Sequence, residues 1–269
     1  MSGERTGFLL RAVVCTLLAA AMIGVSELLG EKEIIFPEIT ALTVGAIAAP
    51  KQSWRVSRVR MVLLIAVCSV LGILIVRYSP LPKAANLVGA YLVCQVIFLL
   101  SRTSFAPMIS AAALPVLMDT ESIIYPISAV SMTVLTVLAQ LILEKCGRRE
   151  REEFTPLSIP DKFRWISAAV RTACAAVIAV PVLLLGWNFC VAPPLLVAFT
   201  EFSNPESRAR QNPVRTVMII TGCALCGAAF RLGLCTFLGL PLTVAGAAVF
   251  MLMALCFRKR SINQTTGQN

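Results

Sequence analysis

Long apolar stretches alternate with short polar connections along the whole chain. Two of the longest, Arg60 to Tyr78 and Ile123 to Leu143, each hold about twenty mostly apolar residues. At a rise of about 1.5 Å per residue, a helix of that length crosses the roughly 30 Å hydrocarbon core of a bilayer. The pattern therefore predicts an all-α membrane protein whose main surrounding is the lipid bilayer.

The breaks between the apolar stretches predict about ten transmembrane segments. These are residues 8–30, 36–49, 61–78, 85–101, 105–118, 123–143, 165–187, 191–203, 216–233 and 240–257. Three of them, 36–49, 105–118 and 191–203, have only 13 or 14 residues, and each carries proline near its start. Such lengths are typical of re-entrant or packed helices rather than of helices that face lipid along their whole length.

The basic residues fall mainly on one set of connections. If every segment crosses and the N-terminus is cytoplasmic, 18 of the 24 Lys and Arg residues lie on the cytoplasmic side and four on the other. Cytoplasmic loops of membrane proteins retain Lys and Arg in this way, so the net charge of +10 does not indicate a nucleic-acid partner. We predict a multi-pass protein of the cytoplasmic (cell inner) membrane with both termini in the cytoplasm.

The chain also repeats itself at a constant offset of 155 residues. Proline, arginine, cysteine and glycine positions of the first half recur in the second: Pro50, Arg55, Arg60, Val62, Cys68 and Gly72 match Pro205, Arg210, Arg215, Val217, Cys223 and Gly227. Six crossings separate the two units. An even number predicts parallel repeats related by an axis along the membrane normal.

This repeat gives the expected domain organisation. Residues 1–143 form a first transmembrane repeat of six segments, and 165–257 form a second, shorter repeat of four segments. Residues 144–164 are a charged cytoplasmic linker, and 258–269 are a cytoplasmic tail.

The remaining composition narrows the function. The chain is 58% hydrophobic and 14% charged, it contains no histidine, and most of its ten cysteines lie in apolar stretches. No nucleophile and base pair, phosphate-binding loop or metal-ligand cluster can be recognised. The sequence therefore predicts neither an enzyme nor a cofactor or metal site.

The short segments carry the candidate site. Short, proline-interrupted segments at corresponding places of two repeats indicate a transporter's substrate site, because a helix that begins inside the membrane presents free N–H groups and a positive dipole end. Glu38 could also accept a coupling proton. The candidate substrate-binding residues are Pro37, Glu38, Thr40, Pro107, Ser110, Pro193 and Pro194, together with Arg11 and Arg171 inside long segments. The alternatives are kinked helices satisfied by their neighbours, and arginines that reach to the interface.

Two stretches resemble a known family. Residues 201–215, rich in proline and arginine, and Thr103 to Pro115, with its alanine-rich stretch, are similar to the first hairpin and the name-giving His-Pro-Pro region of the HPP family of integral membrane proteins. Phe105 and Ala106 stand where the histidine and the first proline would be, and only Pro107 matches. The resemblance covers roughly residues 36–145 and, less completely, 191–257. It implies transport, with nitrite as the substrate suggested for some relatives.

A weaker similarity, through residues 39–44 and the basic loop that follows, is to fusaric-acid-resistance-like exporters. The working hypothesis is a permease for a small anionic solute, with its site between the repeats. An exporter of aromatic or organic acids, and a membrane scaffold or subunit that transports nothing, are the alternatives. A homo-oligomer is compatible with the small-residue helix faces.

Overall fold

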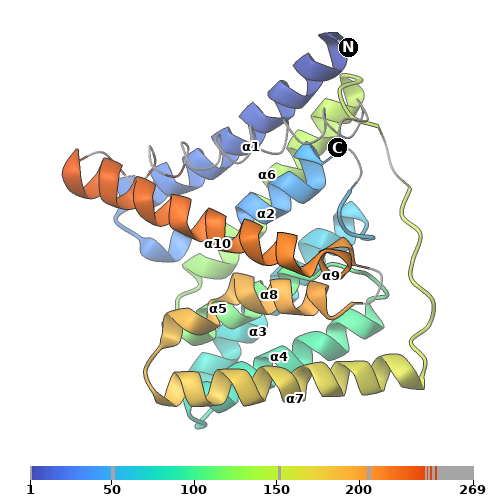
Figure 1. Cartoon of the computed structure of the whole chain (residues 1–269), viewed down its shortest axis with the longest axis vertical. Helices are drawn as coiled ribbons and strands as arrows, with labels where there is room; N and C mark the ends of the chain where they lie inside the picture. Colours follow the sequence, from blue (N-terminus) through green and yellow to red (C-terminus); the bar gives the residue numbers. More distant parts are fainter. Residues whose placement is uncertain are drawn as a thin grey trace.

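The computed structural model describes residues 2–49, 52–150, 153–204 and 207–239, and the single positions 241, 243 and 246. Within these residues all regular structure is helical, which confirms the all-α fold class (Figure 1). Six helices are long and apolar enough to cross a membrane. They are α1 (Ser2–Leu29), α3 (Arg58–Tyr78), α4 (Lys83–Leu100), α6 (Ile124–Lys145), α7 (Lys162–Leu184) and α10 (Pro213–Phe230), the last continued by the π-helix η4 (Arg231–Phe237).

Shorter helices occupy the three short segments. They are α2 (Ile39–Thr43) with the π-helix η2 (Val44–Ala48), α5 (Pro107–Met118), and α8 (Pro193–Phe202). None is longer than about 18 Å at the rise of an α-helix. Proline at the first positions of α5 and α8 explains where these helices begin, since its missing N–H costs nothing there. The remaining elements of the described residues have three or four residues each: η1 (Lys32–Ile34), η3 (Asn188–Val191) and α9 (Arg208–Gln211).

The predicted basic connections meet at one end of the bundle, which we call the basic end. The links there include Arg60 Nη1 to the Ser101 carbonyl (2.9 Å), Arg102 Nε to the Leu157 carbonyl (2.7 Å), Arg149 Nη1 to the Ile47 carbonyl (2.8 Å), Trp54 Nε1 to Glu201 Oε1 (2.7 Å), and an Arg58–Glu144 ion pair. The gathering of these loops on one side agrees with the sequence prediction. Their orientation relative to the cell stays a prediction.

The other end of the bundle, the opposite end, joins the remaining connections. Thr120 Oγ1 donates to Glu33 (3.3 Å), Ser128 Oγ donates to the Ile34 carbonyl (2.6 Å), and Lys83 pairs with Asp119. The chain therefore passes from the opposite end to the basic end through α2 and η2, and back through α5. These short segments connect the two ends although each is shorter than a hydrocarbon core.

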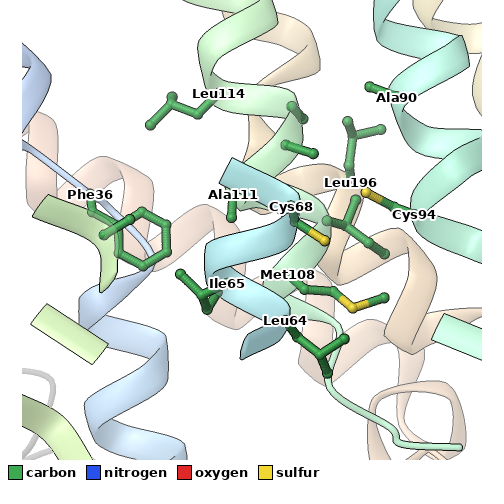
Figure 2. Packing of buried hydrophobic residues seen from close by; sticks show 14 of the residues in the cluster. Phe36, Leu64, Ile65, Cys68, Ala90, Cys94, Met108, Ala111, Leu114 and Leu196 are labelled. Carbon is green, nitrogen blue, oxygen red and sulfur yellow. The ribbon is translucent and has the colours of Figure 1, made fainter. Parts of the chain in front are cut away.

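The core lies where α3, α5, α4 and α8 pack together. Figure 2 shows Ile65 and Cys68 of α3, Met108 and Ala111 of α5, and Leu196 of α8 among the buried side chains of this core. Close approach of α3 and α5 depends on small residues. A Cβ added to Gly72 would lie 2.5 Å from the Ala112 carbonyl oxygen. Small residues at helix contacts are what membrane interiors require, because lipid supplies little hydrophobic drive between helices.

The two halves share part of their element order. In each half a long helix, α1 or α7, ends before a glycine of positive φ, Gly30 (69°) or Gly186 (77°), and a single-turn helix and a short helix follow. The pair Pro50 and Pro205, most of segment 240–257 and the tail 258–269 lie outside the described residues. The ten segments, the domain limits and the rotation relating the repeats therefore remain predictions.

Candidate functional site

Glu38 lies directly before the first residue of α2. Its carbonyl accepts the Leu42 N–H (2.8 Å), so its backbone starts the helix, but its side chain caps nothing. The residue is only 3% exposed. Both carboxyl oxygens are buried, and neither has a hydrogen-bond partner among the described residues. Burying a carboxyl group without a partner is energetically costly, which makes Glu38 the leading candidate among the predicted site residues.

Two polar side chains from other helices surround this carboxyl group. Ser110 of α5 is fully buried and interacts with the Glu38 carboxyl, but its hydroxyl makes no hydrogen bond within the described structure. Tyr125 of α6 lies near enough to Glu38 for an electrostatic interaction. We call Glu38, Ser110 and Tyr125 the Glu38 cluster. It joins the segments 36–49 and 105–118 to α6.

Apolar groups close off the rest of the cluster. The Phe36 ring meets the Tyr125 ring edge-on, with centroids 6.3 Å apart. Phe36, Ile39 and Leu42 are each fully buried beside Glu38 in the chain (Figure 2 shows Phe36 pointing into the core). The two described ion pairs, Arg58–Glu144 and Lys83–Asp119, do not involve Glu38. The surroundings of the Glu38 carboxyl group are thus mainly apolar, and the polar side chains near it are those of Ser110 and Tyr125.

The structure separates the predicted site residues into two groups. Pro107 and Pro193 are buried in the first turns of α5 and α8, in the same core as Ser110. Pro37, Thr40 and Pro194 are exposed, and the Thr40 hydroxyl donates to the Pro37 carbonyl (2.9 Å). The chain therefore brings Glu38 and Ser110 together and leaves Pro37, Thr40 and Pro194 on the surface of the bundle.

The two predicted arginines lie on different helices and have different surroundings. Arg11 of α1 is half-buried near Cys15, and its Nε has no partner in the described structure. Arg171 of α7 is half-buried near the Tyr91 hydroxyl. No described carboxylate forms an ion pair with either one.

A second polar group surrounds Arg171, and we call it the Arg171 cluster: Tyr91 and Gln95 of α4, Arg171 of α7, and Thr200 of α8. The Tyr91 and Thr200 hydroxyl oxygens are 2.7 Å apart. Gln95 is 1% exposed and interacts with Tyr91. The sequence reasoning missed three of these residues. The signal for Gln95 was an amide side chain inside the apolar segment 85–101.

A hollow of about 490 Å³ opens at the basic end, and neither cluster lines it. Its walls include Gln52, Arg58, Gln140 and Phe154. Phe154 belongs to the linker and lies under the Arg60 guanidinium, 4.8 Å from the ring centroid. The linker thus folds back over the basic end beside this hollow.

Comparison of the chain with protein-family models, with curated proteins and with solved structures finds no match.

Proposed function

We propose that this integral membrane protein is a permease for a small anion, and that Glu38 carries the proton coupled to its passage. One observation carries the proposal: the Glu38 carboxyl group is buried inside the helix bundle, without a hydrogen-bond or ion-pair partner among the described residues. Residues of this kind mark ion and proton pathways in membrane proteins.

The surroundings of Glu38 support a proton-carrying role. An unpaired carboxylate in an apolar site loses its hydration, whereas the protonated carboxylic acid is neutral and avoids that cost. A proton on Glu38 also removes the negative charge that would repel an anion. Occupancy by the proton and by the anion would therefore favour each other, as linkage requires.

The short helices support a transport role independently. α2 with η2, and α5, connect the two ends of the bundle, although each is shorter than a hydrocarbon core. Short or interrupted helices of this kind surround the binding sites of many transporters, because backbone groups without helical partners are tolerated only where they are buried or line a cavity. The resemblance to the HPP family implies the same class of function.

Flux into liposomes tests this proposal. Purified protein would be reconstituted, and uptake of nitrite, nitrate, formate and benzoate would be measured with and without an inward proton gradient. We expect uptake of at least one of the three small anions above protein-free vesicles, and an increase when the interior is alkaline. Uptake of benzoate alone would favour an exporter of aromatic acids. No uptake of any anion would leave a membrane subunit without transport activity and would contradict the proposal.

A further inference from the structure

The Arg171 cluster is formed by helices other than those around Glu38. α7 packs along α4, and α8 packs against α5. Tyr91 contacts Thr200 and is also a neighbour of Gln95 and Arg171, so it connects the members of the cluster. Arg171 lies nine residues after Lys162, the first residue of α7, which places it roughly 13 Å along the helix. A cation at that depth normally has a partner, and no described carboxylate pairs with it.

The hydroxyl protons of the cluster are already used. Thr200 Oγ1 donates to the Leu196 carbonyl (2.8 Å), so in its 2.7 Å contact with Tyr91 it can only accept. The Tyr91 proton therefore points at Thr200. This link ties α8 to α4 and fixes the Tyr91 ring beside Arg171, which makes Tyr91 and Thr200 positioning residues.

The donors left over are the Arg171 guanidinium and the Gln95 amide. Neither Nε2 nor Oε1 of Gln95 makes a hydrogen bond within the described residues, although its side chain is 1% exposed. A buried amide without hydrogen-bond partners destabilises the folded protein. A ligand that accepts a hydrogen bond from the amide removes that penalty. Tyr91 is the neighbour that Gln95 and Arg171 share.

We infer that the Arg171 cluster binds a small, planar, monovalent oxyanion, held by the Arg171 guanidinium and the Gln95 amide. This inference rests on the proposed function and deepens it, since it gives the anion a site separate from the proton site at Glu38. A guanidinium presents two parallel N–H donors that match two coplanar oxygens. One negative charge on the ligand neutralises the single cation.

The same argument sets the selectivity. Chloride has no pair of oxygens for the guanidinium fork, so it would bind more weakly than formate, nitrite or nitrate. Sulfate would bring a second charge that no described group of the cluster balances, and a buried uncompensated charge is costly. The expected order is planar monovalent oxyanions first, then chloride, then sulfate.

Calorimetric titration of the purified full-length chain in detergent tests the inference. Formate, nitrite, nitrate, chloride and sulfate would each be titrated into the wild type and into Arg171→Leu, Arg171→Lys, Gln95→Leu and Arg77→Leu. Arg77 is exposed near the end of α3 and serves as the matched control. We expect Arg171→Leu to weaken binding of the best anion at least about tenfold, the loss of one charge-assisted contact, and Gln95→Leu to weaken it several-fold.

Arg171→Lys keeps the charge and loses the fork, so it should retain some affinity while the preference for planar oxyanions over chloride falls. This variant keeps the test decisive if Arg171→Leu does not fold. Unchanged affinity in both Arg171→Lys and Gln95→Leu, or no binding of any of these anions by the wild type, would overturn the inference. If the wild type transports the anions but the variants bind them as tightly as the wild type does, this site is rejected and the permease proposal stands. If the wild type binds the anions, the variants bind them more weakly and no anion is transported, the site stands and the permease proposal is rejected.

Discussion

The Tyr125 hydroxyl donates a 3.1 Å hydrogen bond to the Ala111 carbonyl. In an α-helix that carbonyl would accept the N–H of residue 115, but residue 115 is proline, which lies inside α5 and has no N–H to donate. α6 therefore supplies the hydrogen bond that the proline removes from α5. The same tyrosine lies near Glu38, so the bond also fixes the position of one member of the Glu38 cluster.

Tyr125→Phe should lower the stability of the protein by about 1 kcal/mol, because it leaves the buried Ala111 carbonyl without a partner. The measurement is thermal unfolding in detergent. Tyr78→Phe is the matched control, since Tyr78 is exposed at the end of α3. Equal melting temperatures for the two variants would show that the hydroxyl does not support α5.

Gly72→Ala should destabilise the contact between α3 and α5. The added methyl group would lie 2.5 Å from the Ala112 carbonyl oxygen, and backbone cannot move aside as a flexible side chain can. The expected loss is about 1–3 kcal/mol. Gly89→Ala in α4 is the control, because a Cβ there meets nothing within 4 Å and alanine is the better helix former. If thermal unfolding shows that Gly72→Ala is at least as stable as Gly89→Ala, the close contact between α3 and α5 is contradicted.

Gly45→Ala should disturb the basic end. A Cβ at Gly45 would collide with the Trp54 ring, whose Nε1 donates to Glu201 of α8. We expect the ring to move away from Glu201 and become more accessible to a quencher of tryptophan fluorescence. Double substitutions of Trp165 and Trp187 by Phe would leave Trp54 as the only reporter among the three tryptophans. The prediction fails if quenching of Trp54 is the same with and without the Gly45→Ala substitution.

Membrane orientation can be tested with cysteines at the two ends. Cys146 is exposed at the basic end, and Glu121 is exposed at the opposite end. We predict that the introduced cysteine of Glu121→Cys reacts with an impermeant maleimide in intact cells, whereas Cys146 reacts only in inverted vesicles. The reverse labelling pattern would place the basic end outside and reject the orientation.

Much of the fold could be predicted from the sequence because apolar length and proline are strong local signals. The expected segment 105–118 corresponds to Pro107–Met118, and 191–203 corresponds to Pro193–Phe202, each beginning at its proline. The basic connections also lie together, as charge alone suggested. The split of segment 36–49 into α2 and the π-helix η2 had no signal, since nothing in the residues marks a π-turn.

The candidate site was predicted less well, because apolar sequence on all sides of a short helix does not reveal which face is inside. Glu38 and Ser110 do face each other, but Thr40, two residues from Glu38, is exposed. Gln95 was overlooked because it lies in a long apolar segment without proline. Its place in the Arg171 cluster depends on Tyr91, which contacts α8 and lies near Arg171 of α7. Both of these helices are distant from Gln95 in the sequence.

The internal repeat predicts a specific relation between the two halves of the chain. We expect residues 8–101 to superpose on 165–257 by a rotation about the membrane normal. Superposing the two ranges in a cryo-EM structure of the full-length chain measures that rotation. An inverted relation, or no superposition, would remove the repeat and with it the argument that the site lies between two similar units.

The central claim is that Glu38 binds the coupling proton, and the flux of Glu38→Gln across a range of pH tests it most directly. Glutamine keeps the size of the side chain and cannot release a proton, so we predict flux that is reduced and no longer changes with pH. Glu31→Gln is the control, since Glu31 is exposed in the same connection and should behave as the wild type. Wild-type flux and pH dependence in Glu38→Gln would contradict the account and make Glu38 a structural residue.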